Sequence, residues 1–392
     1  MLPMRPMKLG GEYIIFGENA LEYLTQLEGD KKRALIVLGG SSVQKSGYLT
    51  KIENYLTSAD FTIDYFTGVE PDPSFNTVQK GAQKMVEFGP DWIIAVGGGS
   101  VMDAAKAMWI YYEHPQLKTL EEISPPNKIP ALRKKAKMAC IPTTSGTGSE
   151  VSRSVVITDT ETHIKHGIGD MEMMPDIAIL EPGITASVPP KFTAATGMDV
   201  LTHALEALVS KRANIVADTM AERAAIDVFT YLPAAYKEGN DLVAREKLLL
   251  ASCLAGMAFT NVSLGIVHSI AHAVGGKFGV PHGLANAIIL PYVIEFNSQD
   301  EKAAEIYRQF AEKVGHEDLA QAVRDLNEML EIPAHLKAEI EKDEEFEAAI
   351  PELAELASKD GCTKTNPVIP DVDGFKELIA TIYYGTKIGV QL

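Results

Sequence analysis

Between about residue 13 and residue 182, short apolar runs alternate with stretches of helical spacing. Seven such runs are rich in β-branched or other apolar residues: YIIF, ALIVL, IDYF, WIIAV, MACIP, VVIT and IAIL. Strands that alternate with helices are typical of a parallel sheet in an α/β domain. The sequence therefore predicts such a domain, in which ligands bind at the carboxyl ends of the strands.

After Pro182 the strand pattern gives way to helical spacing, as in FTAATGMDVLTHALEALVS, ADTMAERAAIDVFTYLPAAY and AREKLLLASCLAGMAF. Prolines and a glycine interrupt the periodicity in EPGITASVPP. We therefore expect a Rossmann-like α/β domain over residues 1–184 and an all-α domain over residues 185–392. The acidic run over residues 337–355 has apolar residues at helical intervals and predicts a solvated helix.

The charge of the chain excludes two classes of partner. Its 53 acidic residues outnumber its 36 Lys and Arg residues, and the formal charge of −17 would repel nucleic acid and anionic lipid. No run reaches the ~20 apolar residues of a membrane span, and the first residues lack the apolar stretch of a secretory signal. Three cysteines without paired spacing fit a reducing compartment. We therefore expect a cytoplasmic protein without membrane or nucleic-acid partners.

A glycine turn, GGGSVMDAAK over residues 97–106, follows the run WIIAV and opens a predicted helix. The backbone N–H groups of such a turn, together with the helix N-terminus, can bind a pyrophosphate. Met102 occupies the last glycine position of the GxGxxG fingerprint, so the match is not the strict one. Because glycine turns also simply connect strands to helices, this motif alone leaves both interpretations open.

A second polar loop, PTTSGTGSE over residues 142–150, follows the run MACIP. Its hydroxyls and free amides can bind phosphate, ribose or a nicotinamide carboxamide. One loop of this kind is often only a connection. Two of them at the same edge of one sheet favour a dinucleotide.

Several histidines in the second half have the spacing of metal ligands. Asp199 and His203 are four residues apart, which places both on one face of a helix. His268 and His272 are again four apart, and His282 follows a glycine-rich turn. A single histidine on an apolar helix is more often a hydrogen-bonded core residue. The clustering favours a divalent ion such as Fe²⁺, Zn²⁺, Mn²⁺ or Co²⁺, bound by nitrogen and oxygen atoms.

The motifs GGGSVMDAAK, PTTSGTGSEVS, GMDVLTHALEA and HSIAHAVGGKFGVPHGLANAIILP together resemble those of the iron-containing, or group III, alcohol dehydrogenases. Around MWIYYEHP and AREKLLLASCLAGMAF the chain also resembles the alcohol dehydrogenase half of the bifunctional aldehyde/alcohol dehydrogenases. The resemblance runs through to a late CTKTNP segment. It implies the two-domain fold shared with dehydroquinate synthase, a small alcohol or aldehyde as substrate, and a homodimer or higher homo-oligomer.

The resemblance also implies roles for particular residues. The metal ligands would be Asp199, His203, His268 and His282, with Fe²⁺ as the expected ion and Zn²⁺ as the alternative. His272 would remain unligated beside the nicotinamide and the substrate, where it could relay a proton or orient groups. The dinucleotide would contact Gly97, Gly98, Gly99, Ser100, Asp103, Thr143, Thr144, Thr147, Lys165 and Leu180. For Leu180, packing in the core is an equal alternative.

One departure from the family pattern concerns the choice of dinucleotide. Members that prefer NAD end their second strand with an aspartate that bonds the ribose 2′-hydroxyl, whereas here ALIVL runs into GGSSVQKSG. Without that carboxylate nothing repels a 2′-phosphate, which Ser41, Ser42 and Lys45 could bind. This turn resembles the butanol dehydrogenase and aldehyde reductase branch and favours NADP(H) over NAD(H). We therefore expect Gly39, Gly40, Ser41 and Ser42 to contact the cofactor. Alternatively, Gly39 and Gly40 only make a tight turn.

The expected chemistry is hydride transfer between a small alcohol and nicotinamide, assisted by a metal acting as a Lewis acid. One alternative is a metal- and NAD-dependent lyase resembling dehydroquinate synthase. Its phosphorylated, carboxylated substrate would need several cations, yet Lys277 is the only Lys or Arg between Leu248 and His282. Apolar residues are available there instead, namely Met257, Phe259, Val262 and Leu264. The other alternative is a non-catalytic assembly module, which would need neither the cofactor loops nor the metal ligands.

Overall fold

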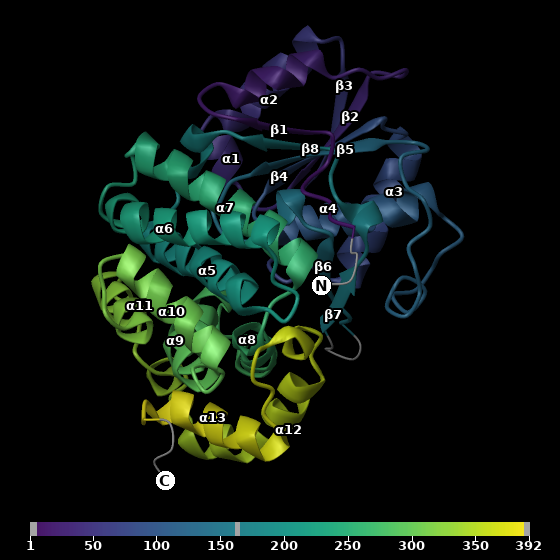
Figure 1. Ribbon diagram of the computed structural model, residues 1–392. Helices are drawn as coiled ribbons and strands as arrows, with labels where there is room; N and C mark the ends of the chain where they lie inside the picture. Colours follow the sequence, from purple (N-terminus) through teal and green to yellow (C-terminus); the bar gives the residue numbers. More distant parts are fainter. Residues whose placement is uncertain (1–5, 161–164, 388–392) are drawn as a thin grey trace. The chain divides into compact units, whose positions relative to one another are not determined.

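The computed structural model describes residues 6–160 and 165–387 (Figure 1). The chain divides into two compact units, Met1–Val188 and Pro189–Leu392. The boundary expected from the sequence, between residues 184 and 185, lies four residues before this division. Each unit is described by itself below.

The first unit is built on a parallel sheet of six strands in the order β1-β8-β5-β4-β2-β3. Their bounds are β1 Tyr13–Phe16, β2 Arg33–Leu38, β3 Thr62–Phe66, β4 Trp92–Gly97, β5 Lys137–Pro142 and β8 Ile177–Leu180. The central strand β4 is buried along its whole length, as expected for a strand covered on both faces. The predicted parallel α/β domain is therefore confirmed.

Helices cover both faces of this sheet. Leu35 and Ile93 face one apolar core, which includes residues of α3 (Phe75–Phe88) and α4 (Gly99–Glu113). Their neighbours Ile36 and Ile94 face the other core, with η1 (Ala20–Gln26), α1 (Ser42–Lys45) and α2 (Tyr48–Ser58). The helices after β2 and after β4 therefore lie on opposite faces. Between these neighbouring strands the sheet has a topological switch point, where doubly wound folds bind ligands.

The run VVIT lies outside the main sheet, contrary to the expectation that it joins the parallel strands. It forms β6 (Ser154–Thr158), which pairs antiparallel with β7 (Lys165–Gly169) in a separate two-stranded sheet. Burial alternates along β6, with Val155 and Ile157 buried and Ser154 exposed. One-sided burial of this kind is typical of antiparallel strands. The partner β7 is polar, with two glycines, and gives no strand pattern in the sequence.

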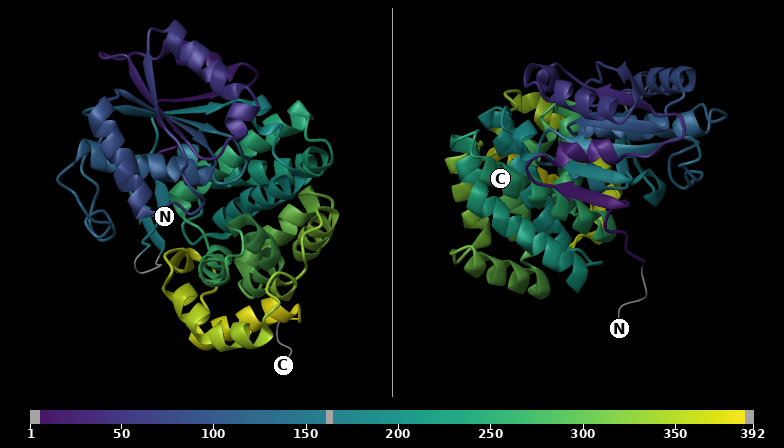
Figure 2. Two further views of the ribbon diagram at one scale, coloured as in Figure 1. Left: turned by 180° about the vertical axis from the view of Figure 1, so that it is seen from behind. Right: turned by 90° about the horizontal axis from the view of Figure 1, so that it is seen from above.

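All regular elements in the described part of the second unit are helices, as predicted (Figure 2). Their bounds are α5 Pro190–Val209, α6 Ile215–Lys237, α7 Leu242–Val262, α8 Ile266–Phe278, α9 His282–Asn297, α10 Glu301–Lys313, α11 Leu319–Met329, α12 Asp343–Lys359 and α13 Val372–Tyr384. Short 3₁₀ turns are η2 Ser149–Val151, η3 Met171–Met173 and η4 Pro182–Thr185 in the first unit, and η5 Leu336–Ala338 and η6 Cys362–Thr365 in the second. Within the acidic run, the α-helix begins only at Asp343 and buries Phe346 and Leu353.

A sharp bend separates α7 from α8. Ser263, at the end of α7, has a φ of 68°, and the two helices bend by 102° across residues 263–265. The bend brings the histidines of α8 back toward α5.

No single helix in the described ranges has both the length and the apolarity of a membrane span, although α7 and α8 pass that test as a bent pair.

Candidate metal centre and dinucleotide site

Helix α5 presents two of the predicted metal ligands. Asp199 and His203 are 3% and 5% exposed, and His203 Nε2 lies 3.8 Å from Asp199 Oδ1. A separation of four residues on a continuous helix brings the two side chains to the same face. The ring of His203 is held between the rings of Phe259 and His268, whose centroids lie 4.5 Å and 4.7 Å away.

Helices α8 and α9 bring the other two predicted ligands to Asp199. His268 Nε2 lies 3.8 Å from Asp199 Oδ1, and His282 Nε2 lies 3.6 Å from the same oxygen. His282 is the first residue of α9, and its side chain is 41% exposed. The next residue, Gly283, lets α9 approach α5, because a Cβ there would lie 2.4 Å from the carbonyl oxygen of Ala195.

The donor atoms of this cluster fit a divalent metal ion. The potential ligand atoms of Asp199, His268 and His282 all lie within 4.8 Å of one another. A tetrahedral ion with bonds of about 2.1 Å separates its ligands by roughly 3.4 Å, which is close to the distances from Asp199 Oδ1 to the three imidazoles. One carboxylate and three imidazoles suit Fe²⁺ or Zn²⁺.

The charges in the cluster also favour metal binding. Burial by itself would raise the pKa of Asp199, but the imidazoles of His203, His282 and His268 lower it below its usual value. Burial lowers the pKa of His268 well below its usual value, and the neighbouring histidines lower it further. An ionised carboxylate and a neutral imidazole are the forms that bind a metal.

Asn286 completes this cluster and is not among the residues singled out from the sequence. Its Nδ2 donates to Asp199 Oδ1 at 2.7 Å and lies 3.2 Å from His268 Nε2 and 3.1 Å from His282 Nε2. The amide thus faces the same three atoms that would bind an ion, and its buried Oδ1 has no hydrogen-bond partner. Its spacing of four residues from His282 is the signal that could have found it.

His272 lies next to the predicted ligands but bonds to a different group. Its ring stacks on that of His282, with a centroid distance of 5.4 Å, and its Nδ1 lies 2.9 Å from Asp360 Oδ2. Burial opposes ionisation of Asp360, yet the hydrogen bond and charge of His272 lower its pKa below the usual value. Cys362 donates its backbone N–H to Asp360 Oδ1 at 2.7 Å. Asp360 lies two residues before the CTKTNP segment and is not among the residues singled out from the sequence.

In the first unit, the two predicted cofactor loops are in contact. Gly97 ends β4 in register with Pro142 of β5, and Thr143 N donates to Gly97 O at 3.0 Å. A Cβ on Gly98 would lie 3.3 Å from Thr144 Oγ1, and one on Gly99 would lie 2.7 Å from Thr147 Cγ2. The structure therefore brings together Gly97, Gly98, Gly99, Ser100, Thr143, Thr144 and Thr147.

The combined loops fit a polar ligand such as a dinucleotide. Gly98 is the N-cap of the 15-residue helix α4, so N–H groups of its first turn are available to an anion. In the second loop, Ser145 Oγ is buried without a hydrogen-bond partner. Ser145 lies within the polar loop but was not singled out from the sequence. An unpartnered buried hydroxyl beside a helix N-terminus is consistent with a ligand that would supply the missing contact.

Asp103, on α4, contacts the second loop at Ser149. Its Oδ1 accepts from Ser149 Oγ at 2.7 Å, and its Oδ2 accepts from Val156 N at 3.0 Å. The buried Lys106 Nζ donates to Ser149 Oγ at 2.9 Å and to Ser152 O at 3.0 Å. Asp103 thus supports the loop through Ser149, and its contact with the cofactor, which the family resemblance implies, stays a prediction.

The remaining predicted cofactor residues lie in different settings. Gly39 and Gly40 follow β2 at the switch point, and a Cβ on Gly39 would lie 3.0 Å from Val101 Cγ2 of α4. Ser41 and Ser42 are exposed at the start of α1, and so is Lys45. Lys165, at the start of β7, forms an ion pair with Asp72 at 2.9 Å. Leu180 is 1% exposed at the end of β8, so its side chain packs in the core.

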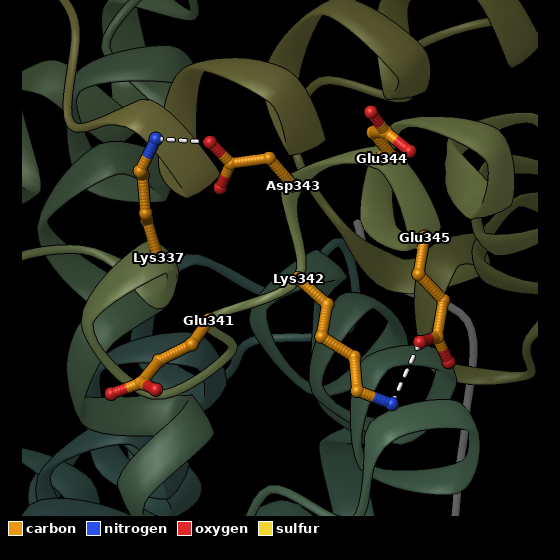
Figure 3. Close-up of a pocket in the computed structure, with 6 residues that line it drawn as sticks. All are labelled: Lys337, Glu341, Lys342, Asp343, Glu344 and Glu345. Carbon is orange, nitrogen blue, oxygen red and sulfur yellow. Dashed lines mark hydrogen bonds and ion pairs between the residues drawn. The ribbon is translucent and has the colours of Figure 1, made fainter.

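A separate surface hollow in the second unit consists of charged residues from η5 to the first turn of α12 (Figure 3). Its ion pairs are Lys337 with Asp343, and Lys342 with Glu345 at 2.8 Å. The six lining residues are Lys337, Glu341, Lys342, Asp343, Glu344 and Glu345. None of them belongs to the predicted metal or cofactor sets.

Comparison with known families identifies the class of protein. Residues 12–182 match the family described as iron-containing alcohol dehydrogenase, and residues 193–383 match the Fe-containing alcohol dehydrogenase family, C-terminal. Together these matches cover most of the chain. The chain belongs to the iron-containing alcohol dehydrogenase family and is an alcohol dehydrogenase, which confirms the resemblance stated from the sequence motifs.

Individual relatives agree with this assignment. The chain is 45% identical over 382 residues to an NADPH-dependent butanol dehydrogenase of Clostridium saccharobutylicum. The alignment covers 96% of this chain and 97% of that protein. It is 39% identical to aldehyde-alcohol dehydrogenase 2 of Entamoeba histolytica, with 95% of this chain and 46% of that longer protein covered. The solved structure of an iron-containing alcohol dehydrogenase from Thermococcus thioreducens matches with a TM-score of 0.89 and 36% identity, over 96% of this chain and 99% of that one.

Proposed function

We propose that this alcohol dehydrogenase transfers hydride between a small primary alcohol or aldehyde and a nicotinamide dinucleotide, with NADP(H) favoured over NAD(H). The observation that carries the proposal is the cluster of donor atoms from Asp199, His268 and His282, which suit a divalent ion. His203 Nε2 lies 3.8 Å from Asp199 Oδ1 and is the proposed fourth ligand. Fe²⁺ is the proposed ion, and Zn²⁺ accepts a similar set of ligands.

The residues of the second unit would hold the ion and prepare the substrate. A bound ion would act as a Lewis acid toward the oxygen of the alcohol or aldehyde. Asp199, His203, His268 and His282 would hold it, and Phe259 fixes the ring of His203 by stacking. His272 is the proposed proton carrier, because Asp360 fixes its Nδ1 and leaves its Nε2 available for exchange. The N-terminal loops would bind the dinucleotide.

Two observations support NADP(H). The turn over residues 39–47 contains no Asp or Glu to repel a 2′-phosphate, and Ser41, Ser42 and Lys45 are exposed there. In addition, the butanol dehydrogenase that is 45% identical is named as NADPH-dependent. Its name also supports a small aliphatic substrate.

The proposed substrate is small and only weakly polar. Lys277, the one cation between Leu248 and His282, already forms an ion pair with Glu352 at 2.7 Å. Phe259 presents an aromatic ring directly against His203, and Met257 is partly exposed on the same helix. These residues favour an alcohol or aldehyde over the phosphorylated, carboxylated substrate that the alternative lyase would need.

The first experiment measures oxidation of NADPH and of NADH by butanal, using protein loaded with Fe²⁺ or with Zn²⁺. Metal-dependent oxidation of NADPH that exceeds oxidation of NADH is the expected result. A preference for NADH would contradict the proposed dinucleotide alone. Absence of turnover with both dinucleotides and a panel of small aldehydes would favour the lyase or the assembly module.

A designed variant tests the choice of dinucleotide. A Cβ on Gly40 meets no atom within 4 Å, so Gly40→Asp can introduce a carboxylate without a clash. We expect Gly40→Asp to raise the KM for NADPH by about tenfold or more, because one repulsive contact of roughly 1.4 kcal/mol suffices for that change. Gly40→Asn is the matched uncharged control, and an equal effect of both variants would refute the charge argument.

The role proposed for His272 is also testable by substitution. His272→Ala should lower turnover, because it removes the proposed proton carrier. Metal content should remain that of the wild type, because His272 bonds to Asp360 through Nδ1 and is not among the proposed ligands. Loss of metal in this variant would contradict the assignment.

We further propose a cytoplasmic homo-oligomer, on the basis of three free cysteines and of family resemblance. Light scattering of the purified chain tests the oligomer.

A further inference from the structure

A buried glutamate on α5 lies directly behind one of the proposed metal ligands. Glu206 is 3% exposed and follows His203 by three residues and Asp199 by seven, so it shares their helix face. Its Oε2 lies 2.5 Å from Nδ1 of His268, which is itself 1% exposed. The carboxylate and the imidazole therefore meet away from water, where a charge-assisted hydrogen bond is strong.

The other oxygen of this carboxylate binds the start of α8. Glu206 Oε1 accepts from Val267 N at 2.7 Å, and Asn366 Oδ1 accepts from Ile266 N at 3.2 Å. A Cβ on Gly265 would lie 2.8 Å from Glu206 Oε1 and 2.5 Å from Asn366 Oδ1, so this position requires glycine. Two side chains thus satisfy N–H groups that a helix N-terminus leaves without partners.

This contact determines which nitrogen of His268 can bind an ion. A carboxylate accepts hydrogen bonds, so Nδ1 carries the proton that faces Glu206. In a neutral imidazole the lone pair then resides on Nε2, the atom that lies 3.8 Å from Asp199 Oδ1.

We propose that Glu206 is a positioning residue for the metal centre, which fixes the tautomer and the ring orientation of His268 while it anchors the first turn of α8. The inference rests on the proposed metal site and names a residue outside the proposed ligand set. Groups that accept a hydrogen bond from the second nitrogen of a metal-bound histidine typically contribute 10–100-fold to metal affinity.

Substitution by glutamine isolates this role, because it preserves size and removes one acceptor. A glutamine offers one acceptor oxygen where the glutamate offers two. If that oxygen accepts from His268 Nδ1, the NH2 group faces Val267 N, and the reverse orientation places the NH2 group against His268 Nδ1. If its amide group donates to Nδ1, the proton of His268 moves to Nε2 and blocks the metal-binding atom. In either orientation the centre loses a contact that the wild type makes.

The experiment measures binding of Zn²⁺ by competition with a chromophoric chelator, and the visible spectrum of the Co²⁺-loaded chain, without dinucleotide or substrate. The matched control is Asp227→Asn, since Asp227 is another buried carboxylate of the second unit and pairs with Arg223 on α6. We expect Glu206→Gln to weaken Zn²⁺ binding by about 10–100-fold and to alter the Co²⁺ spectrum. Asp227→Asn should leave both measurements unchanged.

Thermal unfolding of the metal-free variants separates positioning from a general loss of folding. Wild-type affinity and spectrum in Glu206→Gln would overturn the inference, and so would an equal loss of affinity in Asp227→Asn. Either result would leave the proposed function standing, provided that the wild type binds Zn²⁺. A wild-type chain that binds neither Zn²⁺ nor Co²⁺ would overturn both the proposed metal site and this inference.

Discussion

Asp360 Oδ2 lies 2.9 Å from Nδ1 of His272 and links α8 to the segment that follows α12. The same carboxylate accepts a hydrogen bond from the backbone N–H of Cys362, so the segment that contains Asp360 also fixes its position. His272 is thereby held by a group that is separate from the proposed metal ligands. A proton carrier beside a metal centre needs this independence, since its protonation must change while the ion remains bound.

Asp360→Asn is therefore expected to lower kcat by about tenfold or more, because His272 loses its charged partner. Metal content and the KM for the dinucleotide should remain those of the wild type. Steady-state kinetics of Asp360→Asn, His272→Ala and the double variant check this expectation. Since Asp360 acts through His272, the double variant should be no slower than His272→Ala. Fully additive losses would show that Asp360 acts by another route.

The sequence predicts the two-domain organisation because its strands and helices have clear periods, and it predicts the ligand histidines because they are few and regularly spaced. Glu206 and Asp360 are two among 53 acidic residues, and their roles depend on contacts with residues 62 and 88 positions away. The strand β7 was missed because KHGIG has no apolar alternation. Local patterns thus indicate candidate ligands on one helix, whereas the contacts that orient those side chains arise from tertiary packing.

The buried pair formed by Asp103 and Lys106 through Ser149 provides a test of stability in the first unit. Lys106→Met leaves the Asp103 carboxylate without a compensating cation, so we expect a loss of about 3 kcal/mol in the free energy of unfolding. Lys106→Met combined with Asp103→Asn should cost less than the sum of the single changes. Urea unfolding of all three variants measures this coupling. Lys84→Met, which removes a surface pair with Asp64, is the control and should cost at most about 1 kcal/mol.

Glu150 should make stability depend on pH. Burial raises the pKa of Glu150 from 4.5 to about 7, and its Oε1 has no hydrogen-bond partner. The folded state thus favours the protonated form, so stability is lost as the pH rises from about 4.5 to about 7, by an amount on the order of 3 kcal/mol. Glu150→Gln should gain stability relative to the wild type between about pH 5 and about pH 8 in chemical unfolding. Glu22→Gln, at an exposed position, is the control, and a constant difference across this range would contradict the prediction.

Gly99 tests the contact between the two cofactor loops. A Cβ at this position would lie 2.7 Å from Thr147 Cγ2, so Gly99→Ala must displace the second loop. We expect the KM for NADPH to rise by about tenfold, while Zn²⁺ content stays that of the wild type because the proposed ligands lie in the other unit. Steady-state kinetics and fluorescence titration with NADPH measure the effect. Gly167→Ala, where a Cβ meets nothing within 4 Å, should bind NADPH as the wild type does.

Removal of the metal should lower thermal stability, because an ion that binds only the folded state stabilises it. At a free ion concentration 100 times Kd this gain is about 2.7 kcal/mol. We therefore expect Zn²⁺ to raise the Tm of chelator-treated wild type, as measured by scanning calorimetry. His282→Ala should lose most of this gain, since its partly exposed ring can be removed with little effect on packing. His316→Ala, whose ring is similarly exposed but lies near Asp325 and outside the proposed ligand set, should keep the full gain. Equal gains in both variants would mean that Zn²⁺ stabilises the fold without His282.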